Sequence, residues 1–211
     1  VSKIKQINIV GNQAYAEAEL LDLMKLSTPD WMTWMSSNDQ YSKQKLSADM
    51  ETLRSHYLDN GYLEFAIDST QVSITPNKKD IYITLNISEG AKYTVSKVSV
   101  SGDTLLPKPE IEALVKIKVG DVFSRKALTE TSKLIGERLA QEGHAFANVN
   151  AIPDIDKIKH QVAFNVAVDP GHRVYIRRIN VSGNTKTNDE VIRREFRQIE
   201  STWFDITKIK K

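Results

Sequence analysis

Three short stretches of this chain share one pattern, and this repetition limits the possible folds more than any other feature. The stretches read INIVGN at residues 7–12, VSVSGD at residues 98–103 and INVSGN at residues 179–184. Their glycines, Gly11, Gly102 and Gly183, follow one another at similar long intervals. Self-similarity over such distances predicts tandem copies of one folding unit.

Further landmarks follow in the same order and show where the copies differ. The Asn-Gly-Tyr at residues 60–62 is matched by Glu-Gly-His at 142–144, and the Glu-Gly at 89–90 is matched by Pro-Gly at 170–171. The interval from Gly11 to Gly61 is longer than that from Gly102 to Gly143. The first copy therefore carries extra residues between Gly11 and Gly61.

Within each copy the hydrophobic period changes in a constant order. An alternating strand runs into the glycine, and two segments with helical spacing follow, the second of which ends at Gly61 or Gly143. Two strands joined by a turn close the copy, and the last strand alternates most cleanly, which predicts a sheet with one buried and one wet face. Its apolar positions are Ile81, Ile83, Leu85 and Ile87 in the first copy and Val162, Phe164, Val166 and Val168 in the second. The sequence thus predicts an α+β fold of tandem β-α-α-β-β domains, each a three-stranded mixed sheet with two helices on one face.

The third copy is predicted to be incomplete, since the sequence ends at Lys211, too soon after Gly183 for a whole unit. It offers a first strand around Ile179 and Val181 and a first helix over 189–200. A capping box at 187–190 would open this helix, and its buried stripe would be Ile192, Phe196 and Ile199. The predicted domains are residues 1–91, 92–172 and 173–211.

Composition restricts the class of protein. The chain is 40% apolar and 27% charged, has no cysteine and carries a net charge of +2. No apolar run approaches the roughly 20 residues that span a bilayer, and no signal peptide opens the chain, so a secreted protein would be present as a mature fragment. Six of the nine arginines lie between residues 173 and 197. They suit either an acidic partner or a solvated helix face.

The sequence contains no motif that indicates an enzyme. The four histidines lack the spacing of a zinc pair, and no phosphate loop or nucleophile motif occurs. Balanced charge without basic-aromatic interleaving argues against nucleic acid. Trp31 and Trp34 suit a ligand platform or, more simply, the anchoring of the long loop of the first copy. A non-enzymatic binding scaffold without cofactor or metal is therefore expected in preference to an enzyme or small-ligand module.

The order of elements resembles that of polypeptide-transport-associated (POTRA) domains. The segments QINIVGN, YSKQKLSADMETLRSHYLDNGY, IDSTQVSITPNKKDIYITLNISEG and VIRREFRQIE are similar to the third, fourth and beginning of the fifth POTRA domain of a five-domain periplasmic arm. The resemblance implies a chaperone-like scaffold for outer-membrane protein assembly, at the periplasmic face of a membrane that the full-length protein reaches through a barrel outside this chain. Its expected partners are lipoproteins and unfolded outer-membrane proteins. The alternative is the POTRA arm of a related translocation or secretion pore.

In this family the second strand of the domain is a free edge, expected here at residues 67–75 and 149–155. Pro153 lacks an N–H donor, so the first of these edges should bind extended chains better. The resemblance implies that a BamB-like β-propeller lipoprotein docks on the first edge, at Asp68, Ser69, Thr70, Val72 and Ile74. Val72 and Ile74 suit the core under the helices as well as they suit a docking surface. In a regular strand Asp68 and Thr70 would lie on the same face of the sheet as these two residues.

A second docking surface is implied for a BamD-like lipoprotein. Arg193 and Glu200 are two helical turns apart, which places them on one face of a helix over 189–200. A partner with opposite charges in the same order would match them. The alternative is a solvated helix flank.

Overall fold

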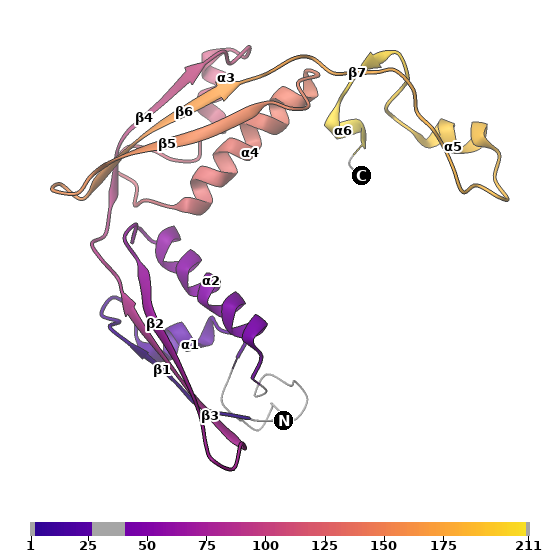
Figure 1. Cartoon of the computed structure of the whole chain (residues 1–211). Helices are drawn as coiled ribbons and strands as arrows, with labels where there is room; N and C mark the ends of the chain where they lie inside the picture. Colours follow the sequence, from indigo (N-terminus) through magenta and orange to yellow (C-terminus); the bar gives the residue numbers. More distant parts are fainter. Residues whose placement is uncertain (1–2, 27–40, 210–211) are drawn as a thin grey trace. The chain divides into compact units, whose positions relative to one another are not determined.

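The computed structural model describes residues 3–26 and 41–209, which divide into two compact units (Figure 1). The first unit comprises Val1–Thr94, Val122–Arg125 and Ile158–His160. The second unit comprises the rest of the chain. Trp31 and Trp34 lie outside the described residues, so the predictions for their loop stay predictions.

The first unit has the predicted β-α-α-β-β order. Its elements are β1 (Lys3–Val10), α1 (Glu17–Asp22), α2 (Lys43–Asp59), β2 (Ala66–Ile74) and β3 (Asp80–Ser88). The sheet order is β1-β3-β2, in which β3 pairs parallel with β1 and antiparallel with β2. This confirms the mixed three-stranded sheet and leaves β2 at an edge.

The core of the first unit lies between the sheet and its helices. The alternating residues of β3 are buried, as predicted, and so is the stripe of Leu46, Leu53 and Tyr57 on α2. Gly61 follows the C-cap of α2 with φ +100°, and Tyr62 N–H returns to the carbonyl O of Tyr57 at 3.0 Å. The glycine therefore ends the helix, as its position predicts.

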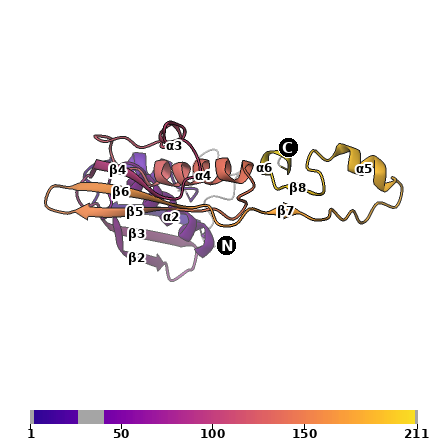
Figure 2. The same cartoon turned by 90° about the horizontal axis from the view of Figure 1, so that it is seen from above.

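The second unit repeats this arrangement. Its elements are β4 (Thr94–Gly102), α3 (Lys108–Leu114), α4 (Arg125–Gln141), β5 (Asn148–Asp156) and β6 (Gln161–Asp169). The sheet order is β4-β6-β5, and Figure 2 shows α3 and α4 on the same side of it. Pro109 lies in the first turn of α3, where the missing N–H of proline costs no helix hydrogen bond.

Equivalent hydrogen bonds locate the extra residues of the first copy more closely than the sequence does. The buried carboxylate of Asp49 accepts from the N–H groups of Lys25 (2.8 Å) and Leu26 (2.9 Å). In the second unit Thr131 Oγ1 accepts from Lys116 N–H at 2.9 Å. Lys25 is related to Lys116 by the same offset as Gly11 to Gly102, whereas Asp49 is related to Thr131 by the shorter offset of Gly61 to Gly143. The insertion therefore lies between Leu26 and Asp49.

The C-terminal segment differs from the prediction. It contains β7 (Tyr175–Ile176), α5 (Asp189–Glu195), β8 (Thr202–Trp203) and α6 (Ile206–Ile209), and β7 pairs antiparallel with β8. Ile179 and Val181 are not in a strand. Up to residue 209, where the description ends, the segment has no equivalent of β3 or β6 against which they could pair. An unpaired strand gains no ladder hydrogen bonds.

The predicted helix over 189–200 is also too long. It ends at Glu195, with Phe196 in an extended conformation, and Phe196 and Ile199 are 46% and 65% exposed. Its N-cap is Asn188 without a side-chain hydrogen bond, so the predicted capping box does not form. The predicted buried stripe is wrong because no sheet covers it within the described part of this segment.

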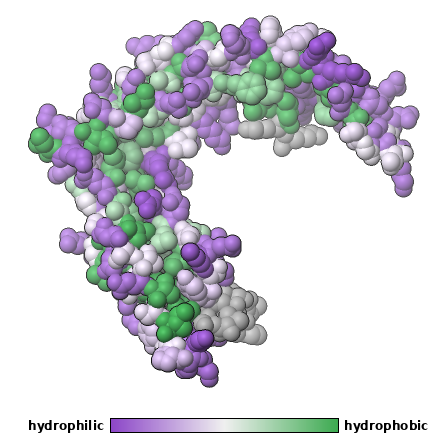
Figure 3. Space-filling view, viewed as in Figure 1, coloured by the Kyte–Doolittle hydropathy of each residue, from purple (hydrophilic) through white to green (hydrophobic). Residues whose placement is uncertain are grey.

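On the face that Figure 3 shows, the surface side chains are mostly polar. In the view of Figure 3, hydrophilic residues cover most of the molecule and hydrophobic ones form small groups. Among the residues described, no helix is long and apolar enough to cross a bilayer.

Candidate interaction site

Strand β2 carries all five residues predicted for the first docking surface. Asp68, Ser69, Thr70, Val72 and Ile74 are all exposed. Val72 is 36% exposed and Ile74 is 54% exposed, so neither belongs to the core. The edge position of β2 in the sheet brings the five together along one line.

The main chain of β2 offers hydrogen-bonding groups at every second residue. Thr75 N–H donates to the carbonyl O of Asp80 at 3.0 Å, so Thr75 faces β3. Antiparallel neighbours alternate between facing their partner and facing away from it. Following the regular register back along β2, Ile74, Val72 and Thr70 direct their N–H and C=O groups away from β3. These groups are available to an added strand.

The side chains of the same three residues lie on the helix side of the sheet. Thr70, Val72 and Ile74 are paired with Leu85, Ile83 and Ile81, whose side chains are buried beneath the helices. Thr70 Oγ1 contacts Met50 Sδ on α2 at 3.3 Å. A shallow cavity of ≈ 340 Å³ follows this side of the edge and is lined by Ser47, Met50, Glu51, Arg54, Ile67 and Thr70. An added strand would therefore meet side-chain contacts as well as main-chain groups.

Asp68 and Ser69 lie in a different local geometry. The register shifts between Ile67 and Ser69, so Asp68 forms a bulge and does not share the parity of Thr70, which corrects that expectation. Asp68 Oδ2 accepts from Ser88 Oγ at 2.5 Å, and Ser69 Oγ accepts from Asn86 Nδ2 at 2.7 Å. Both polar side chains are already paired within the sheet. The sequence pattern carries no clear signal for this bulge.

The matching edge of the second unit is β5, and Pro153 lies at its centre. Ser99 Oγ on β4 donates to the carbonyl O of Phe164 at 3.2 Å, so Phe164 faces β4. Its partner across the β5–β6 ladder is Pro153, which must therefore face the free edge. Pro153 pairs with Phe164 as Val72 pairs with Ile83, so the two residues are equivalent. The second unit thus lacks a donor where the first unit offers one.

Arg193 and Glu200 are close together, but not as successive turns of one helix. Arg193 is on α5, Glu200 follows it in the chain, and Arg193 Nη1 contacts Glu200 Oε1 at 2.9 Å. Arg193 Nη2 donates to the carbonyl O of Ile179 at 2.8 Å, and Glu200 Oε1 accepts from Ile179 N–H at 2.8 Å. The Ile179 N–H and the Arg193 guanidinium lower the pKa of Glu200.

This arrangement corrects the expected display of two free charges. Each of the two side chains pairs with the other, and both clamp the main chain of Ile179. The side chains of Arg193 and Glu200 are 36% and 39% exposed, so part of each remains accessible. The clamp could be identified only from the fold, because sequence spacing says nothing about Ile179.

No group of three or more His, Asp or Glu side chains is placed to hold a metal ion in residues 3–26 and 41–209. The chemistry of the two surfaces is hydrogen bonding, apolar contact and ion pairing. Interfaces between protein chains are built from the same kinds of contact.

Comparisons with known proteins agree with this architecture. The family model for POTRA, described as "Surface antigen variable number repeat", matches residues 2–90, 93–171 and 174–211. The whole chain is 34% identical to the outer membrane protein assembly factor BamA of Neisseria meningitidis and spans 26% of it. BamA of Buchnera aphidicola is 33% identical over 96% of the chain, which spans 33% of that protein.

A solved structure agrees in fold as well. The crystal structure of Haemophilus influenzae BamA POTRA3-5 has a TM-score of 0.83 and 26% identity, and the match covers 99% of this chain and 82% of that one. The chain spans a quarter to a third of the two assembly factors named above. From its sheets, its helices and these matches, the chain belongs to the POTRA family.

Proposed function

We propose that this chain is a non-enzymatic periplasmic scaffold in outer-membrane protein assembly. It binds unfolded outer-membrane proteins and partner lipoproteins, and it does so by adding their strands to the edges of its sheets. The names of its relatives support assembly over a secretion pore, since each is an outer-membrane assembly factor. The domain boundaries we propose are residues 1–91, 92–172 and 173–211.

The alternating outward groups of β2 carry this proposal. Three successive outward positions, Thr70, Val72 and Ile74, follow one another along an exposed edge. Main-chain pairing draws affinity from groups that every polypeptide has, so it suits a protein that must accept many different chains. It needs neither cofactor nor covalent step.

A BamB-like lipoprotein is the proposed partner for the same edge. Exposed Val72 and Ile74 supply apolar contacts, and Asp68 and Ser69 extend the surface at its polar end. Partner and unfolded substrate would then compete for β2. Competition is a measurable consequence that separate sites would not produce.

A BamD-like lipoprotein is the proposed partner for the exposed part of the Arg193–Glu200 pair. Both residues also hold Ile179, so a single charge reversal would disturb the local structure together with the surface. The sharper test is Glu200→Gln, which removes the negative charge but keeps a side-chain oxygen that can accept from Ile179 N–H. Weaker binding by this variant, with circular dichroism unchanged, supports the surface. Undiminished binding removes Glu200 from it.

Proline substitution tests the β2 edge most simply. Val72→Pro removes one outward donor and leaves the ladder to β3 intact, just as Pro153 does in the second unit. We expect binding of an unfolded outer-membrane protein to weaken by about tenfold, the equivalent of roughly 1.4 kcal/mol. Val72→Ala is the matched control, since it shortens the side chain and keeps the N–H.

The outcome separates main-chain from side-chain recognition. If Val72→Ala weakens binding as much as Val72→Pro, the side chain and not the strand edge is recognised. Unchanged binding in both variants would exclude β2 as the site. Ser73→Pro is not a suitable control because Ser73 faces β3 and its substitution would break the ladder.

A further inference from the structure

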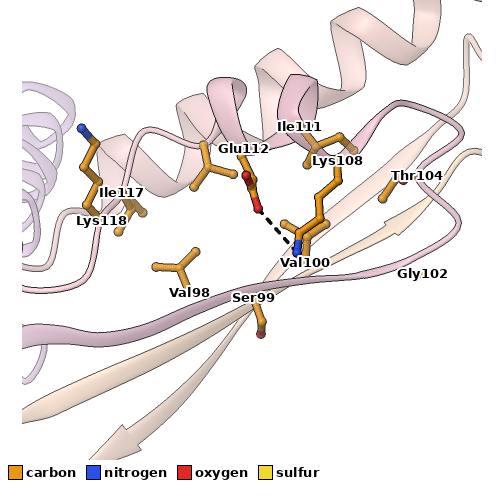
Figure 4. A pocket seen from close by; sticks show the side chains of 11 residues that line it. Val98, Ser99, Val100, Gly102, Thr104, Lys108, Ile111, Glu112, Ile117 and Lys118 are labelled. Carbon is orange, nitrogen blue, oxygen red and sulfur yellow. Dashed lines mark ion pairs between the residues drawn. The ribbon is translucent and has the colours of Figure 1, made fainter.

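A groove runs between β4 and α3 in the second unit, away from the β5 edge. Figure 4 shows it with Val98 and Val100 on the strand and Ile111 on the helix. The cavity volume is ≈ 650 Å³. Strand β4 is the other edge of its sheet, so the groove lies beside main-chain groups as well as apolar side chains.

The equivalent place in the first unit is closed by a carboxylate. Ile9 N–H, which faces away from β3, donates to Glu17 Oε1 at the start of α1 at 2.7 Å. The offset that relates Gly11 to Gly102 places Val100 and Lys108 at these two positions in the second unit. An ammonium group has no acceptor, so Lys108 cannot take the N–H of Val100 as Glu17 takes that of Ile9. Lys108 instead approaches Glu112 at 3.8 Å.

Smaller side chains open the groove further. Ile7, Ile9 and Met24 close the first unit and are 5%, 4% and 8% exposed. Their equivalents Val98, Val100 and Val115 are each shorter and only partly buried, although the surrounding Ile111 and Ile117 are buried. The two units therefore share one fold, but the groove beside the first strand is closed in the first unit and open in the second.

We propose that this groove binds an extended polypeptide segment with apolar side chains at alternate positions and acidic residues at its ends. The segment would pair with the outward groups of Val98 and Val100, and its apolar side chains would cover Val98, Val100 and Val115. Figure 4 shows Lys118 and Lys108 toward opposite ends of the groove. Among the described residues that line it, Glu112 is the one acidic side chain and is 64% exposed in a long ion pair, so the lining is net positive. This site is separate from β2 and goes beyond the function proposed above.

The test uses the whole chain and a short synthetic peptide that alternates valine and threonine between terminal glutamates. Amide resonances of Val98 and Val100 should shift on titration, and a peptide with lysines in place of the glutamates should bind more weakly. Val115→Met copies Met24, fills the groove and changes no charge. We expect it to weaken the affinity by about tenfold. Lys108→Glu copies Glu17 and should weaken it as well, by capping Val100 internally.

Three results would overturn the inference. The first is that the acidic peptide does not bind, and the second is that Val115→Met binds it with the affinity of the unmodified chain. The third is that Val72→Pro loses all peptide binding and that the amide shifts of the unmodified chain are confined to β2. The last result would place the peptide at the edge of the first unit and leave the proposed function intact. Conversely, normal peptide binding in Val72→Pro together with loss in Val115→Met supports the groove whatever the outcome for β2.

Discussion

Gly11 and Gly102 end the first strands of the two units where the last strand of the sheet passes close by. A Cβ atom on Gly11 would lie 2.1 Å from the carbonyl O of Ile87, and one on Gly102 would lie 2.1 Å from that of Val168. Both residues also have positive φ, +100° and +90°. Gly183 keeps a positive φ but has open space around it. The repeated glycine thus follows from the approach of the first strand to the last in a complete POTRA domain.

Substituting these glycines should give unequal losses. We expect Gly102→Ala to lower the free energy of unfolding by about 3 kcal/mol, because strain at positive φ adds to a clash with backbone. Gly183→Ala should cost about 1 kcal/mol, from the strain alone. Urea unfolding of the two full-chain variants measures both losses. Equal losses would show that backbone strain, and not the contact with Val168, requires the glycine.

Tyr57 and Glu89 connect helix, loop and strand end in the first unit. Tyr57 is fully buried, and its hydroxyl donates to Glu89 Oε1 at 2.8 Å. Glu89 also accepts from the N–H groups of Gln13 (2.9 Å) and Ala14 (3.0 Å). Burial, together with the hydrogen bond to the carboxylate, raises the pKa of Tyr57 above its ordinary 10.0.

The raised pKa predicts a loss of stability in alkali. Below pH 10 the tyrosine is neutral in both states, so its contribution is fully present. Above pH 10 the unfolded chain ionises first, and the contribution falls as pH rises toward the folded pKa. Tyr57→Phe should cost about 1 kcal/mol at neutral pH and should remove this alkaline component. Unfolding curves between pH 8 and 12 test it, and parallel losses in both proteins would contradict it.

At the scale of elements, hydrophobic periodicity predicts the strands and helices that have one buried face. The final strands alternate cleanly because one face is buried, so β3 and β6 were predictable, and the helix ends at Gly61 and Gly143 were predictable from their glycines. The bulge at Asp68 was not, because it moves one residue out of register without changing the composition. The outward positions of β2 follow from the hairpin pairing at Thr75, which requires the structure.

The C-terminal segment shows the limit of local pattern most clearly. Ile179 and Val181 alternate as a strand should, yet they form none, since a strand needs a neighbour. Phe196 continues the helical stripe but lies beyond the end of α5. Periodicity indicates what a segment would do inside a complete domain, whereas the structure depends on the elements that are present.

The two edge strands lead to a reciprocal prediction. Pro153→Val gives β5 the outward donor that Val72 provides in β2. We expect the variant to gain binding of extended peptides at the second unit, by about tenfold over the unmodified edge. Amide shifts confined to β5 would locate the gain. If the restored N–H is responsible for the gain, Pro153→Ala should increase peptide binding as much as Pro153→Val does. A gain with valine alone would indicate that the peptide contacts the side chain.

At the scale of the whole molecule, two units of one fold present different edges. Strand β2 offers regular donors, β5 is interrupted by Pro153, and β4 opens into a groove that the first unit closes with Glu17. Tandem domains of this kind can hold several extended segments with little demand on side-chain sequence. We propose that the chain contributes to outer-membrane protein assembly through these different edges.

Amide hydrogen exchange with residue resolution tests the central claim most directly. The chain is measured alone and with an unfolded outer-membrane protein. If that protein adds a strand to β2, exchange should slow at Thr70, Val72 and Ile74, whose N–H groups face outward, and change little at Gln71 and Ser73, which already pair with β3. Protection that is uniform along β2, or absent from these three amides while binding persists, would contradict the account.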